Sequence, residues 1–170
     1  MIPLAKTQHL FKGGKALDLG SGDFQIAKKL QEFGYKVDVV GIEDISPILD
    51  EVNFFRQDML TFNINGYDLI IAQNSLPFTD SRLMIKKIAE GLNNDGMASF
   101  TLFGQRDGWN GRKGMTFIDY GEAIELIKKT GLVIYRRSTE EGYGPTKTGD
   151  IKYWHIHSFV CSKSTKINKT

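Results

Sequence analysis

The 170-residue sequence is poor in cysteine, in net charge and in long apolar runs. Its single cysteine, Cys161, excludes a disulfide within the chain and is typical of a reducing compartment. The formal net charge of +2 is too small to require a polyanionic partner, although a local basic patch is compatible with it. No apolar run approaches the roughly 18 residues of a membrane-spanning helix, and no basic start precedes an apolar stretch as in a secretory signal. We therefore expect a cytoplasmic protein with no membrane partner.

The features that are present fit one globular domain. The length lies within the roughly 100–200 residues of a typical domain. Hydrophobic residues make up 41% and charged residues 25%, which is ordinary for a protein with a hydrophobic core. We expect a single domain over 1–170, in which 1–14 is a short lid segment that brings His9 near the substrate and 162–170 is a polar tail. The sequence leaves open whether the protein is a monomer or a homodimer.

Segments with the apolar pattern of strands alternate with segments that have the spacing of helices. The predicted strands cover 15–19, 37–42, 52–57, 67–73, 97–103, 132–138 and 152–161. The predicted helices cover 26–33, 80–92 and 123–131, with another starting at Ser46-Pro47 and a turn at 93–96. The alternation predicts a parallel sheet with right-handed crossovers. The last two strands have no helix between them, so we expect them to form an antiparallel hairpin.

A glycine-containing turn follows the first predicted strand. Gly20-Ser21-Gly22-Asp23 lies at the carboxyl end of that strand, where doubly wound sheets bind their ligands. A dinucleotide fingerprint would have a third glycine where Gln25 stands, and Asp23 places a negative charge where a pyrophosphate would bind. A cofactor with a cationic sulfonium and an α-amino group suits Asp18 and Asp23 better.

Residues 18–22 resemble the first motif of class I, Rossmann-like, S-adenosylmethionine-dependent methyltransferases. The resemblance implies that Asp18, Gly20, Ser21 and Gly22 line the methionine part of S-adenosyl-L-methionine. It covers nearly the whole chain, and it is nearest to small-molecule methyltransferases of the tellurite-resistance type. It implies an α/β fold, a three-layer αβα sandwich with a mostly parallel seven-stranded Rossmann-like sheet and a C-terminal antiparallel hairpin. We predict that Gly20→Val or Asp18→Ala abolishes cofactor binding and leaves the fold largely intact.

Later segments are similar to the other cofactor motifs of this family. Residues 43–47 resemble the acidic position that binds the ribose, which implies Glu43, or alternatively Asp44, in that role; the commonest spacing would place it at Gly41. Residues 57–59 resemble the motif in which Asp58 meets the adenine amino group and Met59 flanks the ring.

Many members of the family carry a third glycine where Phe24 stands. This departure predicts a turn that is tighter, or that is shielded by the phenyl ring.

Methyl transfer from a sulfonium is an in-line displacement that depends on positioning, so no catalytic triad is expected. A general base is needed only when the acceptor must first lose a proton. Asn74, at the carboxyl end of the fourth predicted strand, is the candidate for a residue that faces the acceptor, and we also include it among the cofactor-binding residues. The sequence identifies no other catalytic residue.

Two histidines near the end of the sequence and a glycine-rich loop have no clear functional motif. His155 and His157 face the same side of the last strand without a third ligand of suitable spacing, so we expect a satisfied or surface pair and no metal site. The loop 104–114, with Trp109 and three cationic residues, is either a lid or a mobile surface loop; Trp109 and Trp154 provide packing or part of that lid.

Three functions remain open. The first is methyl transfer to a small molecule. The second is S-adenosylmethionine binding without catalysis. The third is methylation of RNA or protein.

Overall fold

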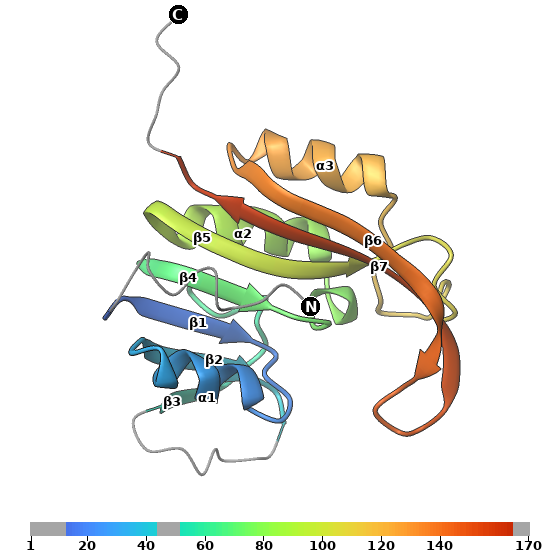
Figure 1. Cartoon of the computed structure of the whole chain (residues 1–170), viewed down its shortest axis with the longest axis horizontal. Helices are drawn as coiled ribbons and strands as arrows, with labels where there is room; N and C mark the ends of the chain where they lie inside the picture. Colours follow the sequence, from blue (N-terminus) through green and yellow to red (C-terminus); the bar gives the residue numbers. More distant parts are fainter. Residues whose placement is uncertain (1–12, 44–51, 165–170) are drawn as a thin grey trace, which may run out of the picture.

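The computed structural model describes residues 13–43 and 52–164, which form a seven-stranded sheet with helices on both faces (Figure 1). Most of the expected lid segment 1–14, the ribose candidate Asp44 and the helix start at Ser46-Pro47 lie outside these residues. In the described part of the chain, no helix is long and apolar enough to cross a membrane.

The sheet has the strand order β3-β2-β1-β4-β5-β7-β6. Its strands are β1 (Lys15–Leu19), β2 (Lys36–Gly41), β3 (Val52–Arg56), β4 (Tyr67–Ala72), β5 (Leu92–Phe103), β6 (Val133–Pro145) and β7 (Ile151–Ser162). Neighbouring strands from β3 to β5 pair in parallel, whereas β7 is antiparallel to both β5 and β6. The expected Rossmann-like sheet and its C-terminal hairpin are therefore confirmed.

The helices divide the core into two layers, one on each face of the sheet. Helix α1 (Gln25–Glu32) packs through Ala27 and Leu30 on the face to which Ala16 of β1 points. Helices α2 (Ser81–Gly91) and α3 (Tyr120–Lys129) cover the opposite face, which receives Leu17. Successive residues of a strand alternate between the two faces, so one short strand contributes to both layers of the αβα sandwich.

Two segments of the sheet differ from the sequence prediction. The predicted turn 93–96 lies within β5, where Tyr67 pairs with Leu92 but Leu69 already pairs with Met97, and Asp95 has a left-handed φ of 61°. The bulge accommodates the extra residues without ending the strand.

The hairpin strands also extend beyond the predicted 132–138 and 152–161. Strand β6 continues to Pro145, and the turn closes through a hydrogen bond from Thr146 N to Asp150 O (2.7 Å). Much of β6 is exposed on both faces and lacks the apolar alternation by which strands are recognised. Figure 1 shows the hairpin running past the carboxyl ends of β1 and β4.

Candidate functional site

The glycine turn is built against the segment that follows β4. Gly20 N donates a hydrogen bond to Val40 O (2.8 Å), and the φ of Gly20 is +74°. A Cβ at Gly20 would stand 2.4 Å from Ser75 Cβ, while Ser75 Oγ donates to Leu19 O (2.6 Å). Gly20 is thus required by the packing of the protein itself. Gly22, with φ +61°, has no atom within 4 Å of its Cβ position and borders open space.

Asp18 lies buried beneath this turn with an exposed fraction of 1%. Neither of its carboxylate oxygens, nor Ser21 Oγ, has a hydrogen-bond partner among the described residues. Burial raises the pKa of Asp18 to about 7, and the charge of Asp23 adds a smaller effect in the same direction. The Ser21 hydroxyl offsets part of this rise, although it is not placed to make a hydrogen bond of good geometry. Buried polar groups normally have partners, so these atoms are available to donors of a ligand.

Phe24 adopts the backbone conformation that a glycine would take at this position. Its φ is 59° and its ψ is 11°, in the left-handed region. The ring is 9% exposed and packs edge-to-face on Phe54, with centroids 5.6 Å apart, in the layer between α1 and the sheet. Of the two expectations, a shielded turn is not observed, because the ring is buried in that core layer. Its burial offsets the roughly 1–2 kcal/mol cost of a left-handed residue with a Cβ.

Glu43 brings a carboxylate to the end of β2. Its Oε2 lies 2.9 Å from the position that a Cβ on Gly41 would occupy. The carboxylate therefore fills the space of a side chain at position 41, the commonest position of the acidic residue in the resembling family. A residue two places later reaches the same location because the chain bends after Gly41.

Asp58 and Met59 follow β3 and have different surroundings. Asp58 is exposed, and its Oδ1 accepts a hydrogen bond from Leu60 N (2.8 Å), so it caps the local turn. Met59 Cε lies 3.4 Å from the Cβ position of Gly20. Met59 therefore lies at the glycine turn. Asp58 instead stabilises the turn in which it lies.

Asn74 follows β4 in a left-handed conformation, with φ 55°. Its N–H donates to Thr101 Oγ1 (2.7 Å), and the Thr101 hydroxyl donates to Asn74 Oδ1 (3.1 Å). Thr101 is buried in β5, so both ends of Asn74 are fixed by one side chain. Strained residues of this kind are concentrated at functional sites.

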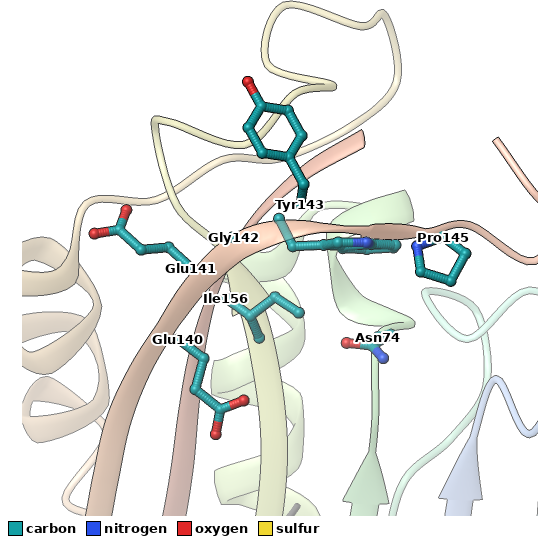
Figure 2. Close-up of a pocket in the computed structure, with 8 residues that line it drawn as sticks. Asn74, Glu140, Glu141, Gly142, Tyr143, Pro145 and Ile156 are labelled. Carbon is teal, nitrogen blue, oxygen red and sulfur yellow. The ribbon is translucent and has the colours of Figure 1, made fainter. Parts of the chain in front are cut away.

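A cavity of about 430 Å³ lies between Asn74 and the hairpin. It is lined by Asn74, Glu140, Glu141, Gly142, Tyr143, Pro145, Trp154 and Ile156. Figure 2 shows Asn74, Pro145 and Ile156 around the same space, with Tyr143 projecting away from Asn74. No sequence signal marks Glu140 or Ile156, because only the register of the hairpin places them beside the cavity.

The charges of this cavity are negative. Its lining contains two carboxylates and no cationic side chain. Glu141 is bound by Arg106 (2.8 Å), which holds the pKa of that carboxyl below its usual range. Glu140 has no ion pair with any residue that the structure describes.

The first part of the loop 104–114 is joined to the hairpin, since Gly104 N donates to His155 O (2.7 Å) and Gly108 N donates to Tyr153 O (2.8 Å). Asp107 accepts a short hydrogen bond from the buried Lys152 ammonium, and it also accepts from the N–H of His155 (3.2 Å). The Lys152 ammonium lies 3.8 Å from the ring centroid of Trp154 and 4.0 Å from that of Trp109. The packing role expected for both tryptophans is confirmed, since they surround a buried cation.

His155 and His157 are buried, with ring centroids 4.6 Å apart. His155 Nδ1 accepts from Arg106 N (3.1 Å), and His157 Nδ1 lies 2.9 Å from Thr139 Oγ1. Burial lowers the pKa of His157 to about 4, so the ring is neutral near neutral pH. Among the residues described, no group of three histidine, cysteine or acidic side chains could hold a metal ion.

Comparisons with known proteins give structural but not sequence relatives. No protein-family model matches the chain, and no curated protein matches it. An S-adenosylmethionine-dependent methyltransferase from Methanosarcina mazei superimposes with a TM-score of 0.70 at 17% identity, covering 96% of this chain and 98% of that one. TehB from Haemophilus influenzae gives a TM-score of 0.74 at 15% identity, covering 94% of this chain and 61% of TehB.

A third solved structure contains two bound molecules. It is the 1,6-didemethyltoxoflavin-N1-methyltransferase of Burkholderia thailandensis, with bound 1,6-didemethyltoxoflavin and S-adenosylhomocysteine. Its TM-score is 0.64 at 16% identity, covering 92% of this chain and 73% of that one. These similarities show that the chain has the fold of S-adenosylmethionine-dependent methyltransferases, as the resemblance of its first motif implied.

Proposed function

We propose that the protein binds S-adenosyl-L-methionine at the glycine turn and transfers its methyl group to a small molecule held in the neighbouring cavity. The proposed binding residues are Asp18, Gly20, Ser21, Gly22, Glu43, Asp58, Met59 and Asn74, with Asp44 as the alternative to Glu43. The single observation that carries the proposal is the unpartnered, buried carboxylate of Asp18, on the strand that leads into the glycine turn with its open position at Gly22. A cationic, amine-bearing ligand would satisfy this carboxylate, whereas a pyrophosphate would be repelled by it.

The cofactor fits the residues at three points along the sheet edge. Asp18 and Ser21 offer unpartnered buried oxygens after β1, and Glu43 offers a carboxylate after β2. Met59 supplies an apolar surface that reaches the turn from the segment after β3. In the family that the sequence resembles, residues at these three positions contact the methionine part, the ribose and the adenine ring of the cofactor, respectively.

The size and the charge of the cavity support a small-molecule acceptor. A volume of about 430 Å³ matches small-ligand pockets. The unpaired carboxylate of Glu140 in its lining disfavours phosphate backbones and other anionic acceptors. Two of the three cationic residues of the loop 104–114 are also engaged elsewhere, since Arg106 binds Glu141 and Arg112 lies over the ring of Trp109.

The reaction assigns positioning roles to this chain. When bound, the cofactor supplies an activated methyl group on a sulfonium. Asp18 would hold the charged end of the cofactor, and Asn74, fixed by Thr101, would orient the acceptor. Alignment of this kind can lower a barrier by roughly 7–11 kcal/mol without a catalytic base.

The proposed location is the cytoplasm, and the proposed organisation is a single domain. Cys161, the only cysteine, is free and buried, and burial raises its pKa to about 12. A free thiol is compatible with the reducing compartment that the composition suggests.

Titration calorimetry with S-adenosylmethionine, S-adenosylhomocysteine and NAD tests cofactor choice. We expect the first two to bind and NAD not to bind. Asp18→Asn should weaken binding roughly ten- to hundredfold through loss of a charge-assisted contact, whereas the exposed Glu90→Gln serves as the matched control. Absence of binding by both sulfur ligands would contradict the proposal.

Radiolabelled methyl transfer into fractionated small molecules, RNA and protein then tests the acceptor class. We expect label in the small-molecule fraction. Binding without any transfer would instead identify a non-catalytic S-adenosylmethionine-binding protein, and label in RNA or protein would contradict a small-molecule acceptor.

A further inference from the structure

Strand β6 is one of the two edge strands of the sheet, opposite β3. It pairs with β7 on one side and is the last strand in the order. After a register shift between Ile134 and Arg136, it runs regularly to Pro145. Residues 136–141 are all exposed, so the strand presents unpaired backbone groups over a long stretch. Proteins usually protect such an edge against pairing with another chain.

The charges on this edge do not protect it against a second copy of itself. Arg136 and Arg137 precede Ser138-Thr139, and Glu140 and Glu141 follow them. Charges of one sign would repel an identical strand. Here the positive half of one strand meets the negative half of its copy whenever the two strands run antiparallel, and opposite charges across a strand pair attract.

The alternation of side chains selects the centre of the pairing. Two residues that oppose one another across a strand pair must have their side chains on the same face of the sheet. When the two strands are identical, a twofold axis perpendicular to the sheet must therefore lie at a residue that opposes its own copy. Arg136, Ser138 and Glu140 oppose alternate residues of β7 and therefore share one face. An axis at Ser138 places Arg136 opposite Glu140 of the second copy, twice.

The available partners favour this centre over its neighbour. An axis at Thr139 would oppose Arg137 and Glu141, but Glu141 is already bound by Arg106 at 2.8 Å. Arg136 and Glu140 have no ion pair among the described residues. Arg137 also has no ion pair there, but Glu141, its opposite charge about Thr139, is taken. Arg136 and Glu140 are therefore the pair of opposite charges on one face of the strand in which both members are unpaired.

We propose that two copies of the protein associate through antiparallel pairing of β6 with β6 about a twofold axis at Ser138. The two sheets become continuous across this axis, through main-chain hydrogen bonds and the two Arg136–Glu140 pairs. One strand pair buries less surface than a standard interface, so we expect a micromolar rather than a nanomolar dimer. Glu140 also lines the cavity, so pairing brings a positive charge of the second copy to the rim of that cavity.

Sedimentation equilibrium over a range of protein concentrations tests the interface by charge exchange. We expect a monomer–dimer equilibrium for the natural sequence that weakens as salt is added. Arg136→Glu and Glu140→Arg should each weaken the dimer roughly tenfold or more, because each change converts two attractive pairs into repulsive ones. The double variant Arg136→Glu, Glu140→Arg should restore association, because its charges are again complementary.

Lys86→Glu provides the matched control. It makes the same change of charge on the exposed surface of α2 and should leave the dimer unchanged. Thermal unfolding of each variant verifies that the fold is retained. Two results would overturn the proposal: sedimentation of the natural sequence as a monomer at every concentration, or a double variant that associates as weakly as the single variants.

Discussion

The Cβ of Ser75 lies 2.4 Å from the point at which a Cβ on Gly20 would stand. The glycine turn after β1 and the segment after β4 are therefore in direct contact. The hydrogen bond from Ser75 Oγ to Leu19 O also connects them. This contact opposes the expectation that Gly20→Val leaves the fold largely intact, because a side chain at position 20 would collide with Ser75 unless the two segments moved apart.

Gly20→Ala should therefore destabilise the protein itself. The steric conflict with Ser75 and the left-handed φ of +74° together predict a loss of roughly 2–4 kcal/mol in the free energy of unfolding. Urea denaturation measures this loss. Gly22→Ala is the control, since it shares the left-handed φ but has open space, and it should lose only about 1 kcal/mol. Equal losses in the two variants would argue against the contact with Ser75.

Asp18 should make the stability of the ligand-free protein decrease as the pH rises. Its pKa is raised from 3.8 to about 7 in the folded state, so between these values the folded protein binds more protons than the unfolded chain. Its contribution is favourable below pH 4, falls through this window and is lost above about pH 7, a total on the order of 4 kcal/mol. Asp18→Asn removes the titration, so the variant should become progressively more stable than the natural sequence as the pH rises. Parallel pH profiles of unfolding free energy for the two proteins would contradict the burial of a charged Asp18.

Glu43 and Gly41 offer a test by exchange of position. Glu43→Ala should weaken S-adenosylmethionine binding roughly tenfold or more, through loss of hydrogen bonds to a carboxylate. Gly41→Asp in that background should recover much of the affinity, because a side chain at position 41 enters the space that the Glu43 carboxylate leaves. Calorimetry of the single and double variants measures both effects. Failure of the double variant to recover binding, in a protein that remains folded, would place the acidic contact elsewhere.

Lys152 should be essential to the packing of the loop 104–114 against the hairpin. Lys152→Met leaves the carboxylate of Asp107 buried without its cation, at a cost of roughly 3–5 kcal/mol. Hydrogen exchange of the Trp109 amide, which donates to Asp107 Oδ1 (3.0 Å), should accelerate as the loop separates from the hairpin. Lys147→Met, in the exposed hairpin turn, is the control and should change neither quantity. Unchanged exchange at Trp109 in Lys152→Met would show that the aromatic packing alone holds the loop.

The architecture could be predicted from the sequence, because it depends on local signals. The apolar strands and the glycines that end α1 and α3 are read within a few residues of one another, and they led to the observed sheet. The bulge at Asp95 was missed because turn residues were taken to end a strand, whereas neighbouring strands kept it in the ladder.

The surroundings of the candidate site could be predicted only in part. Asp18, Gly20 and Glu43 follow strands that a motif identifies, so their place at the sheet edge was foreseeable. The contacts of Ser75 with Gly20 and of Thr101 with Asn74 join residues far apart in the sequence, and only the tertiary register brings them together. The position of Glu140 depends likewise on the unpredicted length of the hairpin.

Asn74 and Ser75 are consecutive residues, yet one lines the cavity and the other holds the glycine turn. A single planar peptide unit separates them, and its geometry is fixed by resonance. The distance between the Cα atoms of the two halves is therefore set by covalent structure at about 3.8 Å, and the hydrogen bonds from Asn74 N to Thr101 Oγ1 and from Ser75 Oγ to Leu19 O hold the two residues in place. A displacement along a line tolerates little lateral error, so a shift of one half of the site is passed directly to the other.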